Sequence, residues 1–244
     1  MVSAGEIVAL QDRLTRLWHG RADEQENSAP LNSVDEWLDL VARQHRANFD
    51  LWHIEDEARA PRVSDAELAA VKRRIDQTNQ LRNDLAEELD RKLLAWLEAR
   101  GLPKADAALN SESPGLIIDR LSILALKIYH TREEMERRDA PEGHAERNLE
   151  RLEVLKEQRA DLAACLDALW QDTVSGVRCF KLYRQMKMYN DPALNPAIYR
   201  KTGSKGAREQ GNEGTRGQGN ERTWEQGNKG TRERENKGTS AEEV

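Results

Sequence analysis

Apolar residues recur every three or four positions along most of this chain, the spacing that places them on one face of an α-helix. All seven prolines fall between the periodic segments, as expected of a residue that interrupts a helix. The spacing and the prolines together predict five helices, at about residues 4–19, 33–60, 64–100, from 114 to beyond 129, and from 142 to Gly176. The predicted fold is therefore an all-α helical bundle.

Two sequence signals mark the start of the later helices. Ser64 and Glu67 form the S-x-x-E pattern of a capping box. Ser113 and Pro114 place an N-cap residue before a proline at the first helical position. The segment 116–129 is apolar on opposite sides, which is typical of a helix buried among several neighbours. We therefore predict that this segment is the central helix of the bundle.

The apolar stripe of the helix predicted over residues 64–100 is interrupted in its middle. Residues 76–84 contain one apolar side chain, Leu81. At 100° per residue, Asn79 and Arg82 nevertheless lie on the face that the rest of the helix turns to the core. A polar patch at a core position is typical of a functional site, because local sequence rules tend to fail where function requires it.

The preceding helix carries a similar interruption. His45 and Asn48 share one helix face with the apolar Trp52. A short turn around Pro61 allows the two helices to pair antiparallel, so that their polar faces oppose each other. The central helix can add Asp119 to the same region.

These polar faces supply the candidate site. The catalytic candidates are His45, Asp56 and Asp119. The candidate ligand-binding residues are Asn48, Glu55, Arg59, Lys72, Asp76, Asn79, Arg82, Asn83, Lys127 and His130. An unpaired charge on the core face would cost several kcal/mol, so Arg82 is expected to be paired. The expected partners are Glu55, Asp56 and Asp119.

Two interpretations of the polar faces stay open. The functional one is a polar pocket inside the bundle, of the kind that helical bundles use for ligands. The structural one is a solvated face, or a charge network that sets the helix register. Asn48, Asn79 and Asn83 favour the pocket, because asparagine is a poor helix former with little benefit on an exposed helical face.

Other chemistry has less support in the sequence. Neither H-E-x-x-H nor a paired E-x-x-H motif is present, so we expect no metal site, and no particular cofactor is indicated. The net charge is −6, and an acidic body has no general attraction for nucleic acid. No segment approaches the roughly 18 apolar residues of a membrane span. The two cysteines suit a reducing compartment, so we expect a cytoplasmic protein.

Four motifs resemble an uncharacterised bacterial family, the domain of unknown function 4254, over about residues 30–199. They are H-R-A-N-F-D-L-W-H-I-E-D-E-A-R, I-D-Q-T-N-Q-L-R-N-D, L-N-S-E-S-P-G-L-I-I-D-R-L-S-I-L-A-L-K-I-Y-H and K-M-Y-N-D-P-A-L-N-P. The resemblance implies a cytoplasmic helical protein whose gene often lies near those of glycosyltransferases for lipopolysaccharide or other surface glycans. It implies no known activity.

Two functions follow as expectations. In the first, the protein binds or acts on a sugar, sugar phosphate or nucleotide sugar, a small-molecule glycan precursor, through the polar cluster. In the second, it is a non-catalytic helical partner or scaffold of a glycosyltransferase, and the polar residues only set the helix register. Whether the protein is an enzyme stays open at this point.

The last part of the chain has a different composition from the rest. From Arg208 it reads as four Gly-containing octads without an apolar face, beginning R-E-Q-G-N-E-G-T and R-G-Q-G-N-E-R-T. Such a repeat supports neither a heptad seam nor a solenoid unit. We therefore predict a bundle domain over residues 1–200 and a disordered tail over 201–244, which also departs from the family pattern.

The predicted tail can be tested by limited proteolysis. Brief digestion should remove the residues beyond about Lys201, because a disordered polar segment is cut before a folded domain. The trimmed core should keep the melting temperature of the full chain. A fall of several degrees after trimming would show that the tail packs on the bundle.

Overall fold

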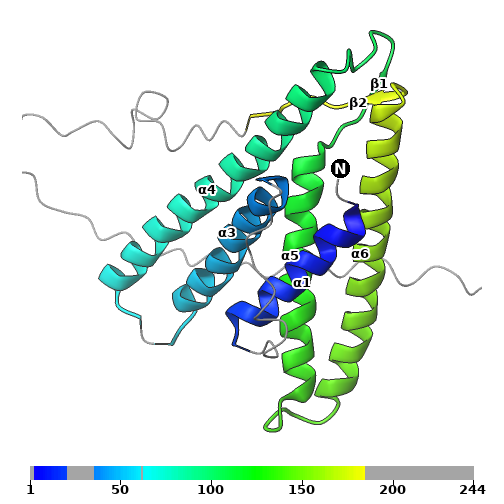
Figure 1. Ribbon diagram of the computed structural model, residues 1–244. Helices are drawn as coiled ribbons and strands as arrows, with labels where there is room; N and C mark the ends of the chain where they lie inside the picture. Colours follow the sequence, from blue (N-terminus) through cyan, green and yellow to red (C-terminus); the bar gives the residue numbers. More distant parts are fainter. Residues whose placement is uncertain (1–2, 21–35, 62, 185–244) are drawn as a thin grey trace, which may run out of the picture. The chain divides into compact units, whose positions relative to one another are not determined.

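A computed structural model describes residues 3–20, 36–61 and 63–184, which belong to one compact unit. Its helices are α1 (Ala4–Trp18), α3 (Glu36–Ala58), α4 (Asp65–Glu98), α5 (Pro114–Glu136) and α6 (His144–Val174) (Figure 1). The all-α bundle of five helices is confirmed for these residues. The predicted tail over 201–244 and the predicted start of the second helix lie outside them. No helix in the described ranges has the length and apolarity needed to cross a bilayer.

The helices begin and end close to the residues that the sequence signals indicate. The capping box at the start of α4 is confirmed: Ser64 Oγ accepts a hydrogen bond from the Glu67 amide at 3.3 Å, and Glu67 Oε2 accepts one from the Ser64 amide at 2.9 Å. Gly101 and Gly176 follow α4 and α6 with positive φ angles of 71° and 78°. Glycine adopts this conformation without steric cost, which lets the chain turn away from each helix.

A short strand pair, which the sequence pattern does not predict, closes one end of the fold. Strand β1 (Ala108–Leu109) pairs in parallel with β2 (Arg178–Cys179), in the register Ala108 to Arg178. Two residues are too few to show the alternation that identifies a strand in sequence. The pair joins the loop after α4 to the segment after α6.

Helices α3 and α4 form an antiparallel hairpin. At the turn, Glu57 accepts two hydrogen bonds from the Arg74 guanidinium, at 2.6 and 3.1 Å. At the far end of the same pair, Lys92 contacts Glu36 at 3.2 Å. The antiparallel pairing predicted from the short connection at Pro61 is confirmed.

Helix α5 is the central helix, as predicted, because it packs against α1, α3, α4 and α6. Ile118, Leu121, Leu126 and Ile128 are fully buried along its length. Figure 1 shows α1 lying across α5 and α6. The amide of Ala4, in the first turn of α1, donates a hydrogen bond to the side chain of Asp167 on α6 at 2.8 Å.

The start of α5 is capped by a residue of α4 instead of its own N-cap side chain. Ser113 occupies the N-cap position as predicted, but its hydroxyl makes no cap hydrogen bond and donates to the carboxylate of Asp90. The Gly115 amide donates to Asp90 Oδ1 at 2.7 Å. Burial raises the pKa of Asp90 to about 6, although the hydrogen bonds from Ser113 and Gly115 act to lower it.

Gly115 is required by the close approach of α4 and α5. A Cβ atom at this position would lie 2.3 Å from the carbonyl oxygen of Ala86 and 2.8 Å from Asp90 Oδ1. The first of these is a backbone atom of α4, which cannot move aside alone. The absence of a side chain therefore sets the distance between the two helices.

We expect Gly115→Ala to destabilise the protein by about 3 kcal/mol or more, because overpacking against backbone forces the helices apart. The matched control is Gly5→Ala in α1, where the nearest atom to a new Cβ is Ser3 Oγ at 3.8 Å. The control should be neutral or gain up to about 1 kcal/mol from helix propensity. Urea unfolding measures both variants, and equal effects would contradict the close approach.

Candidate functional site

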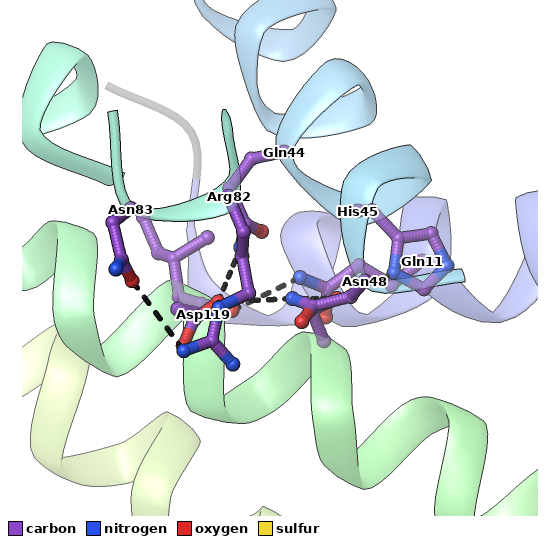
Figure 2. A network of polar contacts seen from close by, with 9 residues as sticks. Gln11, Gln44, His45, Asn48, Arg82, Asn83 and Asp119 are labelled. Carbon is purple, nitrogen blue, oxygen red and sulfur yellow. Dashed lines mark hydrogen bonds and ion pairs between the residues drawn. The ribbon is translucent and has the colours of Figure 1, made fainter. Parts of the chain in front are cut away.

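The carboxylate of Asp119 on the central helix gathers donors from two neighbouring helices. Asp119 Oδ1 accepts hydrogen bonds from Gln44 Nε2 at 2.6 Å and from Asn48 Nδ2 at 2.9 Å, both from α3. Arg82 on α4 approaches the same oxygen with its Nε at 3.8 Å. Figure 2 shows these side chains converging on Asp119. We call Gln44, Asn48, Arg82 and Asp119, together with Asn79 one turn before Arg82 on α4, the Asp119 cluster.

Asp119 is only 9% exposed, and this burial raises the pKa of its carboxyl group. The positive charge of Arg82 acts in the opposite direction, as do the hydrogen bonds from Asn48 and Gln44. Desolvation is the largest of these effects. The site therefore holds a buried carboxyl group that takes up a proton more readily than an exposed aspartate does.

Arg82 is paired, as expected, and its partner is Asp119. The other expected partners, Glu55 and Asp56, instead contact Arg59 at 3.0 and 3.3 Å. The Arg82 guanidinium also donates a hydrogen bond to Asn83 Oδ1 at 3.4 Å, which keeps Asn83 beside the cluster.

His45 lies beside the cluster in a second chain of hydrogen bonds and is fully buried. Its Nε2 is 2.9 Å from Thr15 Oγ1, and its Nδ1 is 2.7 Å from Ser122 Oγ. The Thr15 hydroxyl donates its proton to the carbonyl oxygen of Gln11, so it accepts from His45 Nε2. Nδ1 of the neutral ring then accepts from Ser122, whose oxygen in turn accepts from Asn48 Nδ2 at 2.9 Å.

This arrangement keeps His45 neutral. Burial lowers the pKa of the imidazole to about 3. Because both ring nitrogens are occupied inside the core, His45 joins α1, α3 and α5 and does not face a reactant. The catalytic role expected for His45 therefore has no geometric support.

Three polar atoms of the Asp119 cluster lack a hydrogen-bond partner among the described residues. They are Gln44 Oε1, Asn79 Oδ1 and Arg82 Nε, and all three are buried. Arg82 Nε retains only the longer charge contact with Asp119. Buried polar atoms are nearly always hydrogen-bonded in folded proteins. The unpaired atoms of Gln44 and Arg82, two side chains that both contact Asp119, therefore indicate a missing water or ligand.

Several candidates lie away from the cluster, at the turn end of the α3–α4 hairpin. Lys72 contacts Asp76 at 2.6 Å, and the side chains of these two residues are solvent-accessible. The apolar contacts at this end, centred on Ile54 and Val71, come from α3 and α4 alone. Among the described residues, no third helix contributes to these apolar contacts. Asp56, Glu55, Arg59, Lys72 and Asp76 are therefore surface residues in local ion pairs.

The last two candidates, both on α5, also lie outside the cluster. Lys127 is exposed and lines a groove of about 970 Å³ along α5 and α6. His130 stacks on Trp52, with ring centroids 4.8 Å apart, and lies beside His19 and His53. Burial is the largest effect on His19 and lowers its pKa.

Sequence reasoning missed Gln44 and Ser122. Gln44 lies one turn before Asn48 on the polar face of α3, so the i, i+4 spacing was the available signal. Ser122 sits inside the apolar run of α5, where a hydroxyl group is buried only with hydrogen-bond partners. Its partners on α3 could not be identified before the helices were placed in space.

The protonation of His45 predicts how stability depends on pH. The folded-state pKa of about 3 lies below the 6.5 of an unperturbed histidine. The contribution of His45 to the free energy of unfolding is thus complete above pH 6.5 and is lost as the pH falls toward 3. It amounts to roughly 5 kcal/mol over that window. Asp90 acts with the opposite sign, because its raised pKa favours the folded state as the pH falls below 6.

We therefore compare the wild type with His45→Gln by urea unfolding between pH 7.5 and 4.5. Glutamine keeps a donor and an acceptor but has no titratable group in this range. Below pH 6.5, the free energy of unfolding should fall less steeply with pH in the variant than in the wild type. The difference in slope should reach about 1.4 kcal/mol per pH unit. The contribution of Asp90 is common to both proteins and cancels in the difference. If the stability profiles of the two proteins run parallel, His45 has the same pKa in the folded and the unfolded state.

Comparison with known proteins gives a family for this fold and no activity. No curated protein and no solved structure matches the chain. One family model does match, over residues 38–182, and its description is a protein of unknown function. The match includes α4, α5 and α6 and every residue of the Asp119 cluster. The chain therefore belongs to the DUF4254 family, as its motifs indicated.

Proposed function

We propose that this protein binds a glycan precursor through the Asp119 cluster. The precursor is a sugar, a sugar phosphate or a nucleotide sugar used for a bacterial surface glycan such as lipopolysaccharide, and binding takes place in the cytoplasm. The observation that carries the proposal is a set of unpaired buried atoms: Gln44 Oε1 and Arg82 Nε, whose side chains both contact Asp119, and Asn79 Oδ1 one turn before Arg82.

A polyhydroxylated ligand matches what these atoms lack. Gln44 Nε2 donates to Asp119, so the amide orientation leaves Gln44 Oε1 as an acceptor. Asn79 Oδ1 is a second acceptor, and the Arg82 guanidinium is a donor. Each sugar hydroxyl can donate one hydrogen bond and accept others, so neighbouring hydroxyls can pair with acceptors and donors at once. Pairing would remove the free-energy cost of leaving these atoms buried without partners.

If the bound ligand is also a substrate, Asp119 is the group placed to exchange a proton with it. Desolvation raises its pKa, and the nearby Arg82 can stabilise its charged form. The other catalytic candidates do not fit this role. His45 is enclosed by hydrogen bonds, and Asp56 lies at the surface beside Arg59.

The alternative function is that of a non-catalytic helical partner of a glycosyltransferase. The observation in its favour is the groove of about 970 Å³ along α5 and α6, which includes Ile123, Lys127 and Cys165. An open groove between two long helices suits a partner segment better than an enclosed small molecule. In this case the Asp119 cluster would serve only to hold α3, α4 and α5 in register.

A thermal-shift screen of the purified full chain separates the two functions. At least one compound among the tested sugars, sugar phosphates and nucleotide sugars should raise the melting temperature. A ligand that binds only the folded state stabilises that state. Asn79→Leu should abolish that shift. It should melt at the same temperature as the wild type or higher, because it removes an unpaired buried oxygen.

Two further variants complete the test. Gln77→Ala, on the exposed side of the same turn of α4, should keep the ligand response of the wild type. Asn83→Leu removes an acceptor of Arg82 and should cost about 1 kcal/mol. If no compound shifts the wild type, and Asn79→Leu loses about 1–3 kcal/mol, the cluster is structural and the partner function takes its place.

A further inference from the structure

Three histidines from three helices meet at one place in the bundle. His19 follows the last residue of α1, His53 lies on α3 and His130 lies on α5. One ring nitrogen of each lies within 4.8 Å of one ring nitrogen of both others. All three residues are half-buried. We call them the histidine cluster; it is separate from the Asp119 cluster and from the function proposed for it.

Hydrogen bonds assign the same tautomer to all three rings. In each ring, Nδ1 lies within hydrogen-bond distance of an oxygen that can only accept, so Nδ1 carries the proton and Nε2 keeps its lone pair. The acceptors are the carbonyl oxygen of Thr15 at 2.7 Å for His19, the carbonyl oxygen of Phe49 at 2.8 Å for His53, and Glu133 Oε2 at 2.7 Å for His130.

The Nε2 atoms therefore remain as the ligating atoms of the cluster. Those of His19 and His130 are buried and have no hydrogen-bond partner among the described residues. Buried nitrogen lone pairs without a donor are unfavourable, and lone pairs that face one another also repel. A cation bound between them would relieve both effects.

The surrounding groups hold the rings in place. A histidine that binds a metal typically donates its other ring nitrogen to a carbonyl or carboxylate oxygen, and all three rings do so here. Aromatic side chains add ring contacts that restrict rotation of the rings. They are Tyr129 on His19 with centroids 4.2 Å apart, Phe49 near His53 at 4.3 Å, and Trp52 on His130 at 4.8 Å.

The geometry points to a binding site for one divalent transition-metal ion of the zinc type, held by Nε2 of His19, His53 and His130. Glu133 is the positioning residue that orients His130. Zinc binds histidine nitrogen at about 2.0–2.1 Å, so nitrogens in a tetrahedral site lie roughly 3.4 Å apart. The rings must therefore approach by up to about 1.4 Å on binding. Three protein ligands leave the fourth position to water or to another ligand, as in catalytic zinc sites.

This site differs from the metal-free chain expected from the motifs. The expected spacings were those of a single helix, whereas these histidines lie 34 and 77 positions apart in the sequence, on three helices. Imidazole is a preferred ligand of zinc and of its transition-metal neighbours, while calcium and magnesium prefer oxygen. The ligand set therefore selects the class of ion.

The test uses the full chain without an added histidine tag. After removal of metal with a chelator, Zn²⁺ should bind at one ion per chain by calorimetry. Co²⁺ should give the visible absorption of a tetrahedral site, which Zn²⁺ displaces. Alanine at His19, His53 or His130 should weaken binding at least tenfold, and Glu133→Gln by about tenfold, as for outer-shell partners of other sites.

The matched control is His144→Ala, because His144 lies on α6 and contacts Glu134 instead of the histidine cluster. It should bind like the wild type. The imidazole nitrogen resonances of the wild type give a second readout, which does not depend on the folding of any variant. Zn²⁺ should shift Nε2 of the three clustered histidines and leave His45 unchanged. Absence of stoichiometric binding, or equal losses in His144→Ala and the cluster variants, would overturn the site.

Discussion

Three helices of this bundle meet at a single carboxylate oxygen in its interior. Asp119 Oδ1, on the central helix, accepts from Gln44 and Asn48 of α3 and faces Arg82 of α4. A buried carboxylate without donors would cost several kcal/mol, so α3 and α4 are held at the rotation and height that supply them. An apolar core tolerates many registers of similar free energy, whereas hydrogen bonds to one carboxylate oxygen require a particular placement of their donors.

The central helix places features of different chemistry on different sides. Toward α3 and α4 it presents Asp119, whose surroundings include unpaired buried atoms. Its later turns bring His130 to His19 and His53. Toward α6 it contributes Lys127 to an open groove. Thr15 of α1 links the first two regions, since its hydroxyl contacts His45 and its carbonyl accepts from His19.

Angular position along a helix was predicted well, but position along the bundle was not. Glu55 and Asp76 share helix faces with buried residues, yet they lie at the turn end of the hairpin, where the apolar contacts among the described residues come from α3 and α4. Arg82, farther along α4, lies next to Asp119 instead. Asn79 is one turn before Arg82 on the same helix, and its Oδ1 is buried. Periodicity gives the direction in which a side chain points and contains no information on which neighbour covers that turn.

The sequence by itself determined the helices, their approximate ends, the central position of α5, the pairing of α3 with α4 and part of the polar cluster. These features depend on contacts within a few turns: apolar spacing, capping residues, prolines and one short connection. Tertiary structure alone decided that Asp90 of α4 caps α5, that Ser122 completes the hydrogen bonds of His45, and that three histidines meet. Each of these joins residues far apart in the chain, and their proximity depends on how the helices pack.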